Sequence, residues 1–173
     1  MDYLLEGEES DRLQFRKLTA TDIELWLPFH EDPTILGFWA DDVLPPKTAC
    51  AQWFEKAYYR YENGLGGMNA LIDKTNLTFV GQCGLLTQEV DGVQELEIGY
   101  SLLPLYRNKG YATEAAKKCK SVAFERNLAQ SLISIIHIKN KASQNVAIRN
   151  GMFLDKTTSY KDNPVHIFRI YSP

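Results

Sequence analysis

Residues 97–113 read EIGYSLLPLYRNKGYAT, and this stretch joins a strand to a helix through a tight turn. Pro104 ends the strand, because proline cannot continue the hydrogen-bonded ladder. Beyond the turn, small and apolar residues recur at spacings of three and four, which predicts an amphipathic helix over 111–126. They are Ala112, Ala115, Ala116, Cys119, Val122 and Ala123.

The turn at 107–112 has the composition of an anion site. Gly110 has no side chain and Ala112 has a small one, so a ligand can approach the backbone closely. The first N–H groups of a helix lack partners within the helix, and the dipole places positive potential at that end. Arg107 and Lys109 add cationic side chains. Together these features predict a pyrophosphate site.

Two common phosphate motifs are excluded here. The loop lacks the Gly-Lys-Ser/Thr ending of nucleotide triphosphatases, and it lacks the G-x-G-x-x-G dinucleotide fingerprint. The residues assigned to the pyrophosphate are Arg107, Asn108, Lys109, Gly110, Tyr111, Ala112 and Thr113.

Periodicity and breaker residues predict the remaining elements. We expect a strand at 13–17, a helix from Thr19 or Thr21 to Leu27 that Pro28 stops, and a helix at 48–62. A short strand at 68–72 precedes a hairpin of 79–90 and 93–103 with Asp91 and Gly92 in its turn. A buried strand at 132–138, a helix at 142–150 and strands at 152–160 and 165–171 complete the chain. The fold class is α/β with α+β character, a mixed sheet with helices on both faces.

Length and composition bound the function. The 173 residues fit a single domain over 1–173, with 1–9 as a loose acidic tail that is no secretory signal. A net charge of −3 argues against nucleic-acid binding, and no apolar run approaches the ~20 residues of a membrane span. Three spaced cysteines fit reduced thiols in a cytoplasmic protein, and three scattered histidines predict no metal site.

The chain resembles the GCN5-related N-acetyltransferase (GNAT) superfamily. That family's acetyl-CoA loop reads [R/Q]-x-x-G-x-[G/A], and 107–112 matches every fixed position. Residues 140–153, NKASQNVAIRNGMF, are similar to the N-x-x-S…G-F block of the branch that acetylates ribosomal-protein N-termini (RimJ/RimL-like), as is the opening 10–22. Asn150 departs from that pattern where a lysine is usual, and Met152 where a glycine is usual.

The resemblance implies a mostly antiparallel seven-stranded sheet and acetyl-CoA as the acyl donor. Asn140 would hydrogen-bond the pantetheine arm, a role compatible with capping the helix that follows. The backbone of Tyr100, Ser101 and Leu102 would pair with the same arm. Glu97 stands at the position of the catalytic glutamate in some family members. Glu95 has the same strand parity and is the reserve candidate.

The chemistry requires a neutral amine. A lysine amine titrates near ~10.4 and an α-amine near ~8, so deprotonation at pH 7 costs roughly 4–5 kcal/mol for lysine and ~1–1.5 kcal/mol for an N-terminus. Glu97, directly or through a water, is the predicted base. Many relatives protonate the thiolate with a tyrosine after the buried strand, but this chain has no tyrosine between Ala112 and Ser159. Ser143 is the nearest equivalent, and protonation from solvent is the alternative.

The long segment 28–46 is expected to shape the acceptor site. Phe38 and Trp39, with Glu31, Asp32, Asp41 and Asp42 nearby, predict an acidic and aromatic lip for an amine; loop packing with solvated charge is the alternative. The predicted function is direct acetyl transfer to a primary amine, with a protein N-terminus favoured by the resemblance. A small amine as acceptor, a longer acyl donor and a non-catalytic CoA sensor stay open. The oligomeric state, monomer or homodimer, is equally open.

Overall fold

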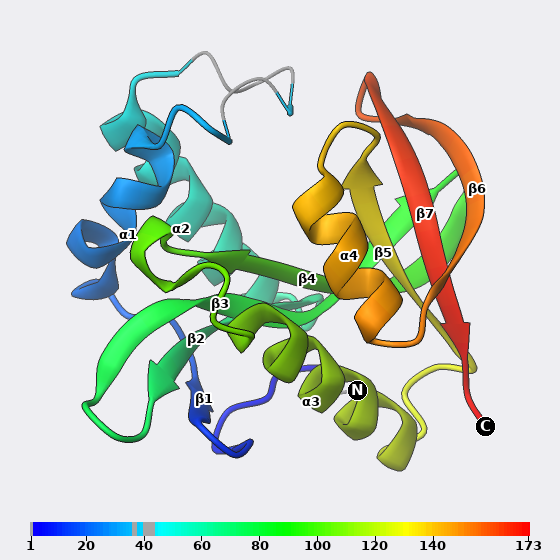
Figure 1. Cartoon of the computed structure of the whole chain (residues 1–173), viewed down its shortest axis with the longest axis horizontal. Helices are drawn as coiled ribbons and strands as arrows, with labels where there is room; N and C mark the ends of the chain where they lie inside the picture. The colour runs from blue at the N-terminus through cyan, green and yellow to red at the C-terminus, as the bar shows by residue number, and fades with distance from the viewer. Residues whose placement is uncertain (1, 36–37, 40–43) are drawn as a thin grey trace.

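The computed structural model describes residues 2–35, 38–39 and 44–173, and Figure 1 shows their arrangement. The helices are α1 (Asp22–Glu31), α2 (Pro46–Glu62), α3 (Tyr111–Glu125) and α4 (Lys141–Arg149), with a 3-10 turn, η1 (Pro104–Tyr106), before α3. The strands are β1 (Leu13–Arg16), β2 (Gly66–Asp73), β3 (Thr78–Val90), β4 (Val93–Leu102), β5 (Ser131–His137), β6 (Phe153–Tyr160) and β7 (Asn163–Tyr171). The predicted order of elements is confirmed.

The seven strands form one sheet in the order β1-β2-β3-β4-β5-β7-β6. Every neighbouring pair is antiparallel except β4 and β5, which are parallel and share a single register pair, Glu97 opposite Ile133. Towards the end of β4, the two strands therefore separate within the sheet. The predicted mixed, mostly antiparallel seven-stranded sheet is confirmed.

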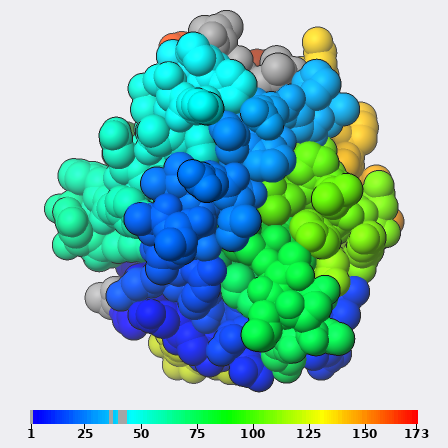
Figure 2. Space-filling view, turned by 90° about the vertical axis from the view of Figure 1, so that its left-hand side faces the viewer, coloured from blue at the N-terminus to red at the C-terminus, as the bar shows by residue number. Residues whose placement is uncertain are grey.

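Helices cover both faces of the sheet, because side chains alternate along the central strands. Leu71, Cys83, Leu85 and Ile98 pack on one face against Ala115 and Cys119 of α3. Ala70, Ile72 and Phe79 pack on the other face against Trp26 of α1 and Phe54 of α2. Figure 2 shows α1 and α2, blue and cyan, lying together on the outside of this second face.

The β3–β4 hairpin turns as its sequence predicts. Asp91 and Gly92 have φ angles of 50° and 77°, and a two-residue turn of this kind requires positive φ at both positions. The turn sets the register Val90 opposite Val93, which in turn places Gln88 opposite Glu95. Local chemistry at two residues thus determines which side chains of β3 face those of β4, the strand that carries Glu97.

Two predictions at the N-terminal part of the chain are wrong. Pro28 does not stop α1, which continues to Glu31, because Trp26 is fully buried and stacks on Phe29 with ring centroids 4.4 Å apart. This packing outweighs the hydrogen bond that proline removes. Residues 2–9 are not a loose tail, because Leu5 is fully buried in the α3 core and its N–H donates to the Asn69 side chain at 3.2 Å.

Candidate active site

The first backbone amides of α3 have no acceptor within the helix. Gly110 is its N-cap residue with φ 82°, no side chain caps the helix, and the first helical bond runs from the Glu114 N–H to the Gly110 carbonyl. The N–H groups of 111–113 therefore have no acceptor within the helix. Asn108, two residues before Gly110, also has positive φ, 60°. This arrangement fits the predicted pyrophosphate.

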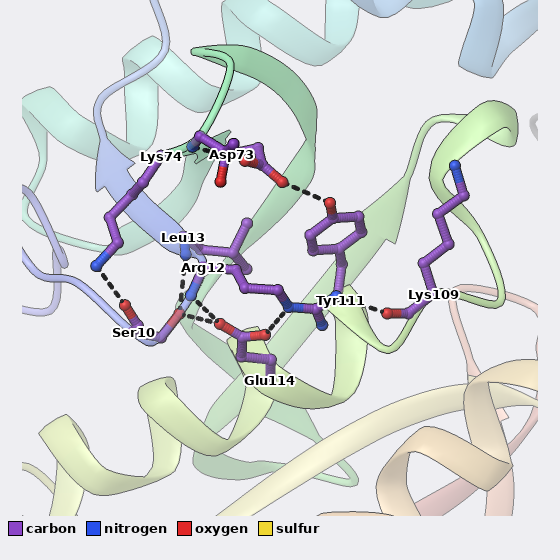
Figure 3. Close-up of polar contacts among 9 residues, drawn as sticks. Ser10, Arg12, Leu13, Asp73, Lys74, Lys109, Tyr111 and Glu114 are labelled. Atoms are coloured by element: carbon purple, nitrogen blue, oxygen red, sulfur yellow. Dashed lines mark hydrogen bonds and ion pairs between the residues drawn. The ribbon is translucent and has the colours of Figure 1, made fainter.

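Figure 3 shows how the N-terminal segment holds this loop in place. The guanidinium of Arg12 donates to the Glu114 carboxylate at 2.7 Å and to the Lys109 carbonyl at 2.9 Å, and it lies 4.3 Å from the centre of the Tyr111 ring. The Tyr111 hydroxyl in turn donates to Asp73 at 2.5 Å. Two segments far from this loop in sequence, at Arg12 and Asp73, thus fix the entry to α3.

Glu114 lies in the first turn of α3, and its carboxylate is fully engaged. Burial pushes the pKa of Glu114 up, but hydrogen bonds from the Arg12 backbone, the Ser10 hydroxyl and the Arg12 guanidinium outweigh it, so the pKa is lowered. These donors keep the Glu114 carboxylate ionised, and the Arg12 guanidinium balances its negative charge near a site expected to receive phosphates.

Arg107, predicted to contact the pyrophosphate, already has partners within the protein. Its guanidinium forms an ion pair with Asp32 and donates to the Thr34 hydroxyl at 3.2 Å and to the Leu102 carbonyl at 3.3 Å. The Lys109 ammonium lies 5.5 Å from the centre of the Tyr106 ring. Of the two expected phosphate cations, Arg107 thus already has a carboxylate partner.

The strands β4 and β5 separate beside Tyr100, Ser101 and Leu102, which lie beyond the single register pair. Tyr100 spans the separation on the α3/α4 face, where its hydroxyl donates to the Ser143 carbonyl of α4 at 2.7 Å. Burial is the main cause that raises the pKa of Tyr100, so its hydroxyl stays protonated. The sequence lacks a tyrosine on α4, and the tertiary structure brings Tyr100 of β4 to that helix instead.

Asn140 caps α4. Its side-chain oxygen accepts the Ser143 N–H at 3.1 Å, the bond expected of an N-cap asparagine. The Ser143 residue is partly buried at the same helix end. The structure thus brings Tyr100, Asn140 and Ser143 together at the separation of β4 and β5.

Glu97 lies on the opposite face, towards α1 and α2. Its carboxylate accepts the Gln88 side-chain N–H at 2.7 Å. Burial raises the pKa of Glu97, while the bond from Gln88, the Ile135 N–H and the charges of Arg60 and Lys161 oppose that rise. A carboxylate with a raised pKa is suited to accept a proton near neutral pH.

The reserve candidate Glu95 has a different environment. Both of its carboxylate oxygens accept from the Arg169 guanidinium, at 2.6 and 3.1 Å, and Arg169 also bonds Asp155 at 2.9 Å. The ion pair is largely buried, with 11% and 12% of the Arg169 and Glu95 side chains exposed. Both oxygens of Glu95 are thus engaged by one guanidinium and are not available to contact an amine, so we keep Glu97 as the proposed base.

Phe38 and Trp39 lie over the end of β5. Their rings are 5.7 and 6.5 Å from the ring of His137, and Trp39 packs on the apolar cluster that also receives Tyr160. Asp32 faces Arg107 rather than this aromatic group, and the predicted lip residues Asp41 and Asp42 lie outside the described residues.

The sequence analysis did not identify three residues of the Glu97 environment, Gln88, Tyr160 and Arg60. The contact of Gln88 could have been predicted from the sequence, because the two-residue turn places Gln88 diagonal to Glu97 across the hairpin. The Arg60 guanidinium donates to the Thr87 carbonyl at 2.6 Å, and Tyr160 comes from β6. No local sequence pattern predicts the contacts of Arg60 and Tyr160, because they depend on how α2 and the β6–β7 hairpin pack.

The cysteines do not form a nucleophilic site. Cys50, Cys83 and Cys119 are free and buried, and the sulfurs of Cys83 and Cys119 lie 3.4 Å apart. Burial raises the pKa of Cys119, which disfavours the thiolate needed for attack. Within the described residues, no group of histidine, cysteine or acidic side chains has the arrangement of a metal site, and no helix is long and apolar enough to cross a membrane.

Comparison with known proteins identifies the family. Residues 12–153 match the model of the acetyltransferase (GNAT) domain. The uncharacterized protein YkkB of Bacillus subtilis (strain 168) is 29% identical over 161 residues, which span 92% of each chain. An acetyltransferase structure from Agrobacterium tumefaciens str. C58 aligns with a TM-score of 0.81 at 22% identity, over 99% of this chain and 97% of that one.

A further solved structure is RimL, a ribosomal L7/L12 alpha-N-protein acetyltransferase in complex with coenzyme A. It aligns with a TM-score of 0.74 at 14% identity, over 95% of this chain and 97% of RimL. At these identities the two solved structures establish the fold, and the match of the domain model over most of the sequence establishes the family. This chain belongs to the GNAT family and is an N-acetyltransferase.

Proposed function

We propose that this enzyme transfers the acetyl group of acetyl-CoA directly to a primary amine, and that the α-amine of a peptide or protein is the preferred acceptor. The observation that carries the proposal is the position of Glu97. Its carboxylate lies where β4 and β5 begin to separate, on the α1/α2 face, while the free amides of α3 and the Tyr100–Asn140–Ser143 group belong to the other side.

On the donor side, the chain supplies backbone rather than side chains. The amides of 111–113 and the loop before them fit a pyrophosphate, and the edge of β4 at 100–102, which β5 does not pair, fits an extended arm as an added strand. Acetyl-CoA supplies an already activated thioester, so the enzyme's main task is to provide a neutral, positioned amine.

Glu97 is proposed to take up the proton that the amine loses, either directly or through one water. A positioned base typically contributes ~10²–10⁴-fold to the rate. For an α-amine, the remaining cost of deprotonation at pH 7 is only ~1–1.5 kcal/mol, against roughly 4–5 kcal/mol for a lysine. A single carboxylate base therefore favours an α-amine, and the similarity to RimL, an alpha-N-protein acetyltransferase, supports the same acceptor.

The leaving thiolate needs a proton or a hydrogen bond. Tyr100, whose hydroxyl stays protonated, and Ser143 are the groups of this chain at the α4 end of the separation. We propose that one of these hydroxyls serves the thiolate. Transfer is direct, because Cys119 is enclosed in the core and its thiol is held protonated.

The test is a peptide panel incubated with acetyl-CoA. Each sequence is offered with a free N-terminus and no lysine, and as an N-blocked peptide that carries one lysine. Mass spectrometry locates the acetyl group, and free-thiol release measures turnover. We expect acetylation of the free N-termini and at least tenfold slower reaction with the blocked lysine peptides.

The panel also includes reactions with small amines and a control reaction that contains enzyme and acetyl-CoA but no amine. Turnover confined to small amines would overturn the peptide acceptor but leave acetyl transfer standing. Tight CoA binding without turnover on any amine would overturn catalysis itself and favour a sensor.

A further inference from the structure

We propose that Gln88 and Tyr160 are positioning residues for Glu97, with the Tyr160 hydroxyl fixing the Gln88 amide so that its N–H donates to the Glu97 carboxylate. This inference rests on the proposed role of Glu97 as the base. It adds two residues, from two further strands, to the machinery of that base.

The three side chains form a continuous chain of hydrogen bonds. The Tyr160 hydroxyl of β6 donates to the Gln88 side-chain oxygen at 2.9 Å, and the Gln88 nitrogen of β3 donates to Glu97 of β4 at 2.7 Å. Gln88 pairs directly with Glu95, so it reaches Glu97 as a diagonal neighbour on the same face. All three residues are partly or largely enclosed, in contrast to the exposed glutamine Gln94 on the same hairpin.

The direction of these bonds determines their effect. An ionised carboxylate only accepts, so the Gln88 nitrogen must face Glu97 and the Gln88 oxygen must face Tyr160. A phenol that donates to that oxygen holds the amide in this orientation. Burial raises the pKa of Tyr160 to about 12, so the phenol keeps its proton near neutral pH. Tyr160 therefore favours the ionised form of Glu97 through Gln88.

The other charged groups near Glu97 do not replace the hydrogen bond from Gln88. Arg60 of α2 and Lys161, which follows β6, favour the ionised carboxylate from a distance, whereas burial opposes it. Glu95, on the same strand, is neutralised by Arg169, and Tyr100 faces the other side of the sheet in its protonated form. Among the groups that lower the pKa of Glu97, the hydrogen bond from Gln88 is the largest.

The expected result is an ordered series of pH profiles. Gln88→Leu removes the donor and should move the acidic limb of kcat upward by about one pH unit, with the KM for acetyl-CoA unchanged. Tyr160→Phe should move it upward by about half as much, because the amide is kept but no longer oriented. The double variant should match Gln88→Leu alone, because Tyr160 acts only through Gln88.

Matched controls separate positioning from general damage. Gln94→Leu removes a glutamine that donates to the exposed Glu89 at 3.2 Å, and Tyr171→Phe alters an exposed tyrosine of β7 that stacks on Phe153. Neither should move the acidic limb. Gln88→Asn and Gln88→Glu complete the series: the shorter amide should restore part of the wild-type profile, and the added carboxylate should move the limb furthest upward.

The second readout does not depend on turnover. Carbon NMR of protein labelled at the glutamate carboxyl follows the titration of Glu97, whose signal is identified by its loss in Glu97→Gln. The same upward shifts are expected there, in the same order. Unshifted titration of Glu97 in both single variants would overturn the inference, even if their activity fell. Failure of the proposed function would show itself separately, as no turnover on any amine while the NMR shifts persist.

Discussion

The carboxylate of Asp32 accepts a hydrogen bond from the guanidinium of Arg107, so the segment after α1 is tied to the loop before α3. Thr34 supports the pair, because its N–H and its hydroxyl both donate to Asp32, at 2.9 and 2.8 Å. The Asp32 side chain is only 9% exposed. A phosphate that reaches this loop therefore competes with Asp32 for Arg107.

Variants of this ion pair should affect CoA binding in opposite directions. Arg107→Ala removes a charge-assisted donor worth about 1.5–3 kcal/mol and should weaken CoA binding at least tenfold. Asp32→Asn removes the competitor and should tighten binding a few-fold, measured by calorimetry at low salt. Asp91→Asn, at the β3–β4 turn, is the matched control. Weaker binding in Asp32→Asn would mean that Asp32 orients Arg107 for the phosphate instead.

Gly110 is expected to be intolerant of an acidic side chain. Gly110→Glu places a carboxylate beside the free amides of α3 and should abolish detectable CoA binding through charge repulsion and steric overlap. Gly92→Glu is a close control, because Gly92 has a similar φ of 77° and open space around it, away from the loop. Equal CoA affinity in the two folded variants would contradict the assignment of the loop.

Glu97→Gln should lower turnover at neutral pH by about 10²–10⁴-fold and by less at high pH, where the free amine is more abundant. Its effect on stability has the opposite sign. Because the pKa of Glu97 is raised in the folded protein, the ionised carboxylate destabilises the fold above that pKa. The variant should therefore melt at a higher temperature at pH 7, and the difference should vanish below about pH 4. An unchanged pH–rate profile would remove Glu97 from the base role.

Glu95→Gln should lower the stability of the protein without changing the pH dependence of its activity. It breaks a largely buried ion pair with Arg169, although Asp155 keeps a partial partner for the arginine. We expect a loss of about 2 kcal/mol in the free energy of unfolding, measured in urea, with no change in the shape of the pH–rate profile. A shifted acidic limb in Glu95→Gln would reopen the choice of base.

Glu114→Gln tests the clamp that holds the phosphate loop. The pKa of Glu114 is lowered in the folded protein, so its contribution to stability is present above the unfolded value near ~4.3 and is lost as the pH falls through the folded value. The variant should lose about 1 kcal/mol at pH 7 and match the wild type near pH 3. Equal stability at pH 7 would show that Arg12 and Ser10 add nothing there.

Local chemistry was readable from the sequence alone. The small residues of the 107–113 loop, the Asp91–Gly92 turn and the helical spacing of α3 each act over a few residues, so their patterns predict a pyrophosphate loop, a hairpin and the helix behind it. Pro28 is the local rule that failed, because the buried stack of Trp26 on Phe29 carried α1 past it.

Tertiary structure decided which of the predicted groups are available. Glu95 and Glu97 share one strand and one face, and only packing shows that Arg169 occupies the first while Gln88 and Tyr160 support the second. Likewise, Arg107 is engaged by Asp32, 75 positions away. The pattern of a strand determines the face of a side chain, but its charge state and partners depend on residues that only the folded chain brings within hydrogen-bonding distance.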